Sequence, residues 1–277
     1  MVGKREKQAE KRKTSGLSVL RWALIVICVI VMICCGVYLA RLALESRQIK
    51  QAANSAVTQF VQPGEMSAPA LDHTADATES GEGSELALSS IDFTSLQNAC
   101  PNAVGWIQVV GVDAIDYPIV HYSDDEYYLN HSWDGQSSRY GAIFMETANT
   151  RDFSDCYTLI YGHNMKDGSM FGGLKKYRDQ SFYEQNGGQI IIYLPDETRI
   201  YQIFSVHVTS ADDERVYTVG FAHDDTYGSF LETLRKQSLY DTGVSVSAED
   251  NVITLSTCAG EDRLVVHAKQ ISTVPVA

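Results

Sequence analysis

An uncharged apolar stretch near the N-terminus is the feature that most constrains this chain. Nineteen residues, from Trp22 to Ala40, carry no charge, which is about the length that an α-helix needs to cross a hydrocarbon layer of ~30 Å. The preceding KREKQAEKRK is rich in Lys and Arg, and such an excess marks the cytoplasmic side of a span. We predict a basic cytoplasmic head (1–16), a single-pass transmembrane signal anchor (17–42) and export of the remainder. Cleavage as a signal peptide is the alternative, but the apolar run exceeds the ~7–15 residues of such a core.

The rest of the chain is acidic. The net charge is −13, yet residues 1–50 hold ten Lys or Arg and three Glu, so residues 51–277 hold twelve Lys or Arg and 32 Asp or Glu. Phosphate contacts need clustered cations, and this balance argues against a nucleic-acid partner. Residues 43–90 begin with helical spacing and continue with a segment rich in Gly, Ser, Ala and acids, which buries too little to order itself. We expect a helical or flexible extracellular stalk over 43–90 and one folded domain over 91–277.

Short β-branched and aromatic runs, bounded by Gly or Pro, dominate the folded domain. Runs of this kind at short intervals predict a mostly β fold, a closed or nearly closed β-barrel with a few peripheral helices in its loops. The strand candidates are VGWIQVVGV, AIDYPIV, YGAIFME, CYTLIYGH, QIIIYLP, RIYQIFSVHVTS, NVITLSTC and RLVVHAKQI. Helical spacing or composition marks DEYYLNHSW, SMFGGLKKY and YGSFLETLRKQSLY.

Three of the six cysteines lie inside the apolar stretch and three lie beyond it. Cys100 and Cys156 could pair with each other, and the sequence leaves this open. Cys258 ends the run TLSTC and is followed by Arg263, the only arginine after it. A small buried cysteine and a solvated arginine are the plain interpretation of such a pair.

The last two strand candidates fit a hairpin with its turn inside 259–262. This register places Cys258 opposite Arg263 and gathers Thr254, Ser256 and His267 on the same face, while the other face is largely apolar. Directly opposite residues have Cβ atoms ~4.5–5.5 Å apart. A neighbouring cation lowers a thiol pKa and could also hold a developing oxyanion.

A proton-transfer partner for the thiol has to come from the histidines. His267 lies on the same face as Cys258 but about 13 Å along the strand, at ~3.3 Å per residue, which is too far for direct transfer. His121 and His131 sit beside tyrosines and are most simply packing residues. His163 ends an apolar strand candidate at Gly162 and opens a Gly-rich loop, a setting typical of functional histidines.

The combination of motifs resembles the class B sortases. TLSTC with a following Arg, YGHNMKDGSMFGGL about a hundred residues earlier, and VGWIQVVGVDAIDYPIVHYSDDEYYLNHSWDG with GAIFME upstream carry the resemblance, which covers nearly all of residues 91–277. The interval from Cys258 to Arg263 is shorter than is usual in that family. The family's members are cysteine transpeptidases on the outer face of Gram-positive membranes, which agrees with a single-pass protein whose catalytic domain is extracellular.

The resemblance also implies roles. Cys258 would attack the carbonyl of a threonine in a C-terminal, NPxTN-like sorting motif and form a thioacyl intermediate. Arg263 and the backbone N–H of Ala259 would stabilise the oxyanion, and His163 would protonate the leaving amine. The acyl group would pass to an amine of a peptidoglycan precursor or a pilin. The implied partners are thus secreted proteins with a sorting signal and the membrane, with no metal or organic cofactor.

Substrate contacts follow from the same resemblance. Leu129, Tyr161 and Ser256 match groove positions of the family, as does Ala259, and Asp125 stands where the family often has Asn. Leu129 and Tyr161 can equally be read as packing residues. The segment Asp224–Tyr240 matches the helix of a late specificity loop and reads equally as an amphipathic surface helix.

Three other functions compete with this interpretation. A pilin-polymerising sortase of another class often carries an Asp-Pro-aromatic lid, and this chain contains no Asp-Pro. A hydrolase would need the same three catalytic residues. A non-catalytic surface binding module would keep its cysteine buried and unreactive.

Overall fold

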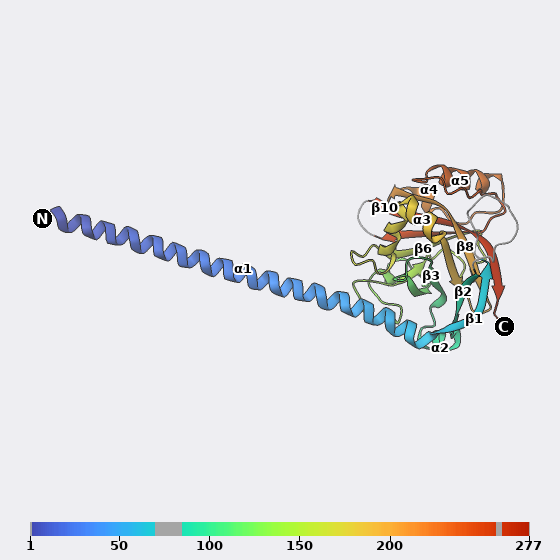
Figure 1. Ribbon diagram of the computed structural model, residues 1–277, viewed down its shortest axis with the longest axis horizontal. Coiled ribbons are helices and arrows are strands. Elements are labelled where there is room, and N and C mark those ends of the chain that lie inside the picture. The colour runs from blue at the N-terminus through green and yellow to red at the C-terminus, as the bar shows by residue number, and fades with distance from the viewer. Residues whose placement is uncertain (1, 70–84, 259–261, 277) are drawn as a thin grey trace. The chain divides into compact units, whose positions relative to one another are not determined.

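A closed β-barrel forms the body of the folded domain (Figure 1). The computed structural model describes residues 2–69, 85–258 and 262–276. Within them eight strands close in the order β10-β8-β7-β3-β4-β5-β6-β9. The pairs β4–β5 and β6–β9 are parallel, and the other pairs are antiparallel. The strands are β3 (Ala103–Val109), β4 (Asp116–Val120), β5 (Ile143–Met145), β6 (Tyr157–His163), β7 (Gln189–Tyr193), β8 (Glu197–Ser210), β9 (Val252–Cys258) and β10 (Asp262–Pro275).

All eight strand candidates are confirmed, and so is the mostly β barrel. Buried Ile, Val, Leu, Met and aromatic side chains from all eight barrel strands form one apolar core cluster. Ile107, Ile160, Ile192 and Ile203 are all completely buried there. The alternation of apolar side chains therefore placed the strands correctly, because every strand buries one face in this cluster.

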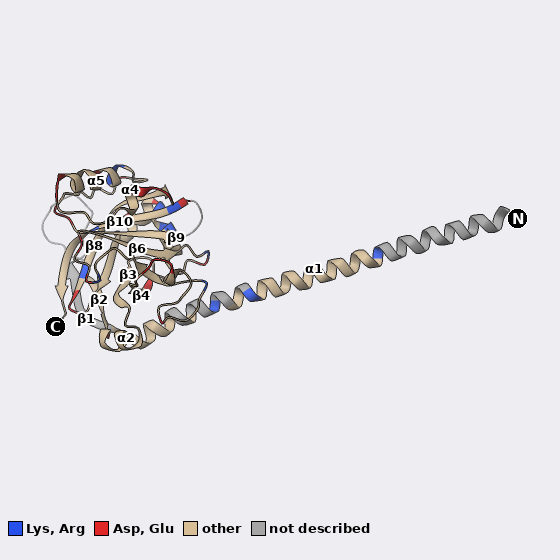
Figure 2. Ribbon diagram, turned by 180° about the vertical axis from the view of Figure 1, so that it is seen from behind, with Lys and Arg blue, Asp and Glu red and all other residues tan. Residues whose placement is uncertain are grey.

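Helix α1 (Val2–Phe60) contains the apolar stretch. The segment Arg21–Arg41 has a mean hydropathy of 3.0 and is long and apolar enough to cross a membrane. Figure 2 shows it as an uncharged length of α1 between arginine positions. The segment fits the predicted anchor, and the helix continues beyond it as expected.

The chain joins the folded domain earlier than the expected boundary at residue 91. Strands β1 (Val61–Pro69) and β2 (Glu85–Ile91) form an antiparallel pair. Phe60 is completely buried, Leu88 is nearly so, and the rings of Phe60 and Trp133 form a T-shaped pair at 5.6 Å between centroids. A few apolar side chains are enough to hold this segment against the domain, because they pack on residues of the barrel such as Trp106. The centre of the expected stalk, residues 70–84, lies outside the described residues.

Short helices fill the connections between strands. They are α2 (Phe93–Ala99), η1 (Tyr127–Leu129), η2 (Phe171–Arg178), α3 (Gln180–Asn186), α4 (Glu214–Tyr217) and α5 (Asp225–Lys236). Asp224 caps α5 by accepting a hydrogen bond from the Tyr227 N–H at 2.9 Å. Leu231 and Leu234 are buried, which confirms the amphipathic helix expected in Asp224–Tyr240. Figure 1 shows α4 and α5 together on the outside of the barrel.

The predicted register of the last hairpin is confirmed from Lys269↔Val252 to Val265↔Ser256. Its polar face is not a solvent face, however. Ser256 is 1% exposed and His267 is 0% exposed, because α4 and α5 cover this side of β9 and β10 with a second apolar cluster. The Thr254 hydroxyl and His267 Nδ1 lie 2.7 Å apart and satisfy each other in this interior.

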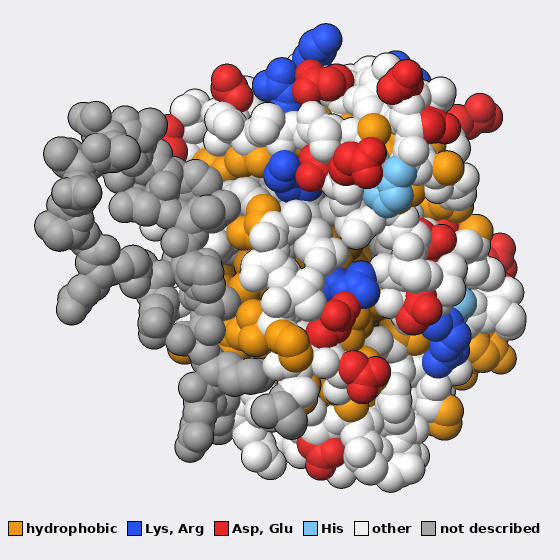
Figure 3. Space-filling model, turned by 90° about the vertical axis from the view of Figure 1, so that its right-hand side faces the viewer, with side chains coloured by type: hydrophobic (Ala, Val, Ile, Leu, Met, Phe, Trp, Pro, Cys, Tyr) orange, Lys and Arg blue, Asp and Glu red, His pale blue; other side chains and the backbone are white. Residues whose placement is uncertain are grey.

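Cys100 and Cys156 are both buried and both free, so they do not form a disulfide. They belong to two different apolar clusters. Burial raises the pKa of each thiol. On the face drawn in Figure 3, Lys and Arg side chains are interspersed with Asp and Glu rather than gathered in a patch of one sign.

Candidate active site

His163 and Cys258 are brought together by the parallel pairing of β6 and β9. His163 is the last residue of β6, Cys258 is the last residue of β9, and the two are register partners. Adjacent strands lie ~4.7–4.9 Å apart, so the backbones at these positions are direct neighbours. The pairing of the two strands thus places both predicted catalytic residues at one end of the barrel.

Backbone packing holds His163 at this end. Its Nε2 lies 3.1 Å from the Leu129 carbonyl oxygen. A Cβ at Gly141, which has φ of +58°, would lie 3.1 Å from the His163 ring and 2.3 Å from the Tyr128 carbonyl oxygen. A Cβ at Gly162 would lie 2.7 Å from the Phe171 ring. Glycine is required at both places because neighbouring groups occupy the space of a side chain.

A groove with a volume of about 300 Å³ contains most of the other predicted residues. Leu129, Tyr161, Ser256 and Arg263 all line it, as does Asp125. Phe144, Ala211 and Tyr217 complete the lining. Residues predicted from four separate segments therefore share one groove. Ala259 lies outside the described residues.

Tyr217 and Glu146 were not singled out by the sequence. Tyr217 ends α4, stacks on Tyr161 at 6.3 Å between centroids, and its hydroxyl lies 3.1 Å from Ser256 Oγ. Glu146 follows β5, and its Oε2 accepts a hydrogen bond from the Tyr161 hydroxyl at 2.7 Å. Burial raises the pKa of Glu146, and the nearby charge of Asp125 raises it further. The run GAIFME gives no sign of this role, because an acid directly after a short apolar strand is ordinary in a sequence.

Asp125 and Arg263 both line the groove. Asp125 Oδ1 accepts hydrogen bonds from the Thr147 N–H and hydroxyl, each at 2.8 Å. Arg263 is partly buried near the start of β10, where it is the register partner of Thr209 on β8. Its predicted pairing with Cys258 lies beyond the β9–β10 ladder that the structure records and stays a prediction.

His131 and His121 are held by packing. His131 stacks on Tyr127 at 4.0 Å between centroids, and its Nδ1 lies 2.8 Å from the Tyr127 carbonyl oxygen. His121 Nε2 lies 3.3 Å from the Thr147 carbonyl oxygen. Both agree with the packing interpretation of these residues. Among the described residues, no three His, Cys, Asp or Glu side chains converge as metal ligands.

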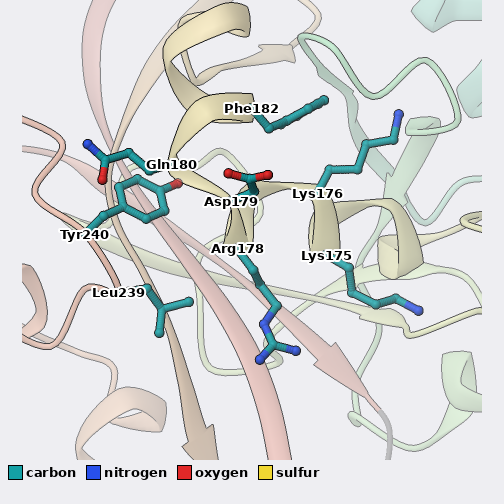
Figure 4. A pocket seen from close by; sticks show the side chains of 8 residues that line it. All are labelled: Lys175, Lys176, Arg178, Asp179, Gln180, Phe182, Leu239 and Tyr240. Atoms are coloured by element: carbon teal, nitrogen blue, oxygen red, sulfur yellow. The ribbon is translucent and has the colours of Figure 1, made fainter.

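A larger hollow of about 580 Å³ lies at η2 and α3, away from these residues (Figure 4). It is lined by Lys175, Lys176, Arg178, Asp179, Gln180, Phe182, Leu239 and Tyr240. Figure 4 shows that its two lysines and its arginine point away from one another. Asp179 caps α3 by accepting from the Ser181 N–H. These cations would suggest an anion site only if their donors converged on one point, and they do not. The groove is therefore the better candidate for an active site.

The family model of the sortase domain matches residues 107–271. The chain belongs to the sortase family. Sortase B of Listeria monocytogenes is 36% identical over 187 residues, which is 65% of this chain and 74% of the relative. Sortase B from Bacillus anthracis in complex with AAEK1 matches with a TM-score of 0.65 and 33% identity, over 83% of this chain and 98% of that one. The Staphylococcus aureus sortase B–substrate complex matches with a TM-score of 0.61 and 32% identity, over 65% and 84%.

These similarities make the chain a class B sortase and a cysteine transpeptidase, as the sequence motifs predicted. The matched residues contain the barrel strands β4 to β9 in full. They also contain the end of β3 and most of β10, because β3 begins before residue 107 and β10 ends after residue 271. It therefore contains the groove and the pair His163–Cys258.

Proposed function

We propose that this sortase is anchored in a membrane, cleaves a C-terminal NPxTN-like sorting motif after its threonine, and transfers the acyl fragment to a cell-wall or pilin amine. The observation that carries the proposal is the register pairing of His163 with Cys258 at one end of the barrel. The groove lies beside this pair, because Leu129 lines the groove and its carbonyl oxygen lies 3.1 Å from His163 Nε2. A nucleophile, a proton carrier and a peptide-sized groove are the parts that acyl transfer needs.

In the first half-reaction the Cys258 thiolate attacks the threonine carbonyl carbon and a C–S bond forms. Arg263 and the Ala259 N–H stabilise the oxyanion of the tetrahedral intermediate. The C–N bond then breaks, and His163 as imidazolium gives its proton to the leaving amine. A thioester remains on the enzyme.

In the second half-reaction the acceptor amine attacks the thioester. His163, now neutral, takes the proton of the attacking amine, and the C–S bond breaks to release the Cys258 thiolate. Both starting protonation states are restored. The acyl group ends on a new amide, and no cofactor enters the scheme.

The lining of the groove supports an extended peptide substrate. Leu129, Phe144, Tyr161 and Tyr217 supply apolar surface, and Asp125 and Arg263 supply opposite charges. The S. aureus relative of known structure is a substrate complex. In this proposal the sorting motif occupies the groove described above.

The apolar segment of α1 supports the anchor. Its Arg21–Arg41 stretch matches the thickness of a bilayer, and the basic residues before it favour a cytoplasmic N-terminus. The catalytic domain then faces the outside, where secreted substrates and wall amines are found.

The test uses the full chain in detergent micelles with NPxTN and LPxTG peptides, with and without a short glycine peptide. Intact mass is read for the wild type and for Cys258→Ala, His163→Ala and Arg263→Ala. The expected result is a thioacyl adduct on the wild type with the NPxTN peptide, absent from Cys258→Ala and discharged by the glycine amine. Discharge by water at the same rate would identify a hydrolase instead. Absence of any adduct would overturn the proposal.

A further inference from the structure

Glu146 is an acid next to the groove with no role in the scheme above. It follows the completely apolar strand β5, is about half buried, and lies outside the set of residues that line the groove. Burial and the neighbouring Asp125 both raise its pKa, so the carboxylate is held at an energetic cost. A carboxylate in a partly buried position is expected to make a specific hydrogen bond that offsets this cost.

That contact is with Tyr161. The Tyr161 hydroxyl donates to Glu146 Oε2 at 2.7 Å, within the range of charge-assisted hydrogen bonds. The ring of Tyr161 lies between Phe144, at 5.2 Å between centroids, and Tyr217, at 6.3 Å. Three aromatic rings from β5, β6 and α4 thus form a continuous wall of the groove.

The wall is fixed at both ends. At one end Glu146 holds the Tyr161 hydroxyl. At the other end the Tyr217 hydroxyl shares a hydrogen bond with Ser256 Oγ, two residues before Cys258 on β9. An aromatic ring keeps one orientation only where its polar end has a partner or its faces are packed. Loss of the Glu146 contact would free the Tyr161 ring to tilt and change the shape of the groove.

We propose that Glu146 is a positioning residue for transpeptidation: it orients Tyr161 through this hydrogen bond and so sets the groove for the sorting peptide. Glu146 acts only through Tyr161 and touches neither the substrate nor the reacting atoms. The proposal rests on the proposed function, because the groove has to receive a peptide.

The test measures the rate of thioacyl formation against peptide concentration for the full chain in detergent micelles. Glu146→Leu removes the acceptor and is expected to raise KM about tenfold with kcat changed less than about twofold, since a hydrogen bond to a charged group is lost while the reacting groups stay in place. Tyr161→Phe removes the donor and is expected to do the same. The double variant is expected to match either single variant, because both break one contact.

Rescue and controls separate positioning from general destabilisation. Glu146→Gln keeps an acceptor oxygen at the same reach and is expected to restore KM to within about threefold of the wild type. Glu249→Leu, an exposed site away from the groove, is the matched control and is expected to leave KM unchanged. Additive effects in the double variant, or an unchanged KM in Glu146→Leu, would overturn the proposal.

Failure of the two proposals is distinguishable. A wild type that forms no adduct contradicts the proposed function itself. A wild type that forms adduct while Tyr161→Phe keeps the wild-type KM contradicts only the role of Glu146. If Glu146→Leu does not fold, Tyr161→Phe and Glu146→Gln still decide the question, because they break or keep the same hydrogen bond.

Discussion

His163 and Cys258 are register partners on two parallel strands, although η2, α3, β7, β8, α4 and α5 separate them in the chain. Parallel partners cannot be joined by a tight turn, so this neighbourhood exists only when the long intervening segment has folded around the barrel. Side chains that hold that segment in place therefore support the active site even where they lie far from it.

Gly141 is expected to be essential for the placement of His163. Alanine at a positive φ costs about 1–2 kcal/mol by itself, and at Gly141 its Cβ would also meet the Tyr128 carbonyl oxygen at 2.3 Å. We expect Gly141→Ala to lower the free energy of unfolding by about 1–3 kcal/mol more than the backbone cost alone, and to slow thioacyl formation.

Gly220→Ala is the matched control for Gly141→Ala. Gly220 also has a positive φ, +79°, but a Cβ there would meet nothing within 4 Å. Gly220→Ala is expected to lose only the stability that a positive φ costs an alanine, with no steric clash. It should form the thioacyl adduct at the wild-type rate. Equal losses of stability in the two variants, measured by urea unfolding, would contradict the steric argument.

The sequence predicted the strands and the register of the last hairpin, and it gave no prediction of long-range strand pairings. The β9–β10 register followed from the alternation of Leu255 and Val266 with polar neighbours, because a slip by one residue mixes the two faces. The pairing of β6 with β9 has no such local signal. It was not predicted: the resemblance gave His163 and Cys258 roles in one reaction, and the structure shows the strand pairing behind it.

Burial of the polar face was the main feature that the sequence did not indicate. Thr254, Ser256 and His267 alternate as a solvent-facing set would, yet they lie under α4 and α5. Tyr217 was missed for a related reason: α4 has only four residues and no periodicity that a pattern could detect. Docked elements of this kind are set by tertiary contacts rather than by their own sequence.

Leu231 is expected to be a major contributor to the docking of α5. Its side chain is completely buried in the cluster that joins α5 to β6, β8 and β9. Leu231→Ala should lower the free energy of unfolding by about 2–5 kcal/mol, because a buried leucine leaves a cavity. Leu239→Ala, at a side chain that is 50% exposed, should change it by less than about 0.5 kcal/mol. Similar losses in urea unfolding would show that α5 is not held by this cluster.

The pair His207–His267 is expected to make the domain less stable in acid. The two rings stack at 5.0 Å between centroids and are 4% and 0% exposed. Burial lowers the pKa of His207 to about 4; the charge of Asp213 opposes this to a smaller extent, and the charge of Arg215 adds to it. Burial, and then His207, lower the pKa of His267 well below its usual value.

The sign of this effect follows from proton uptake. Below about pH 6.5 the unfolded histidines bind protons that the folded ones do not, so the free energy of unfolding falls as the pH drops from about 6.5 towards 4. Each histidine contributes up to about 1.4 kcal/mol per pH unit. His207→Leu should flatten this slope in urea unfolding between pH 7 and 4.5, whereas His223→Leu, at an exposed site, should keep it. A slope unchanged by His207→Leu would contradict the assignment.

Arg263 is expected to act on the rate of the chemical step rather than on peptide binding alone. It lines the groove from β10, and removal of one preorganised oxyanion donor lowers kcat by a factor of about 10²–10³. Arg263→Ala should show this loss in the rate of thioacyl formation, and Arg263→Lys should recover only part of it because an ammonium lacks the planar fork of a guanidinium. Arg215→Ala removes an exposed arginine that does not line the groove; it is the matched control and should react at the wild-type rate. Transfer by Arg263→Ala at the rate of the Arg215→Ala control would show that another donor stabilises the oxyanion.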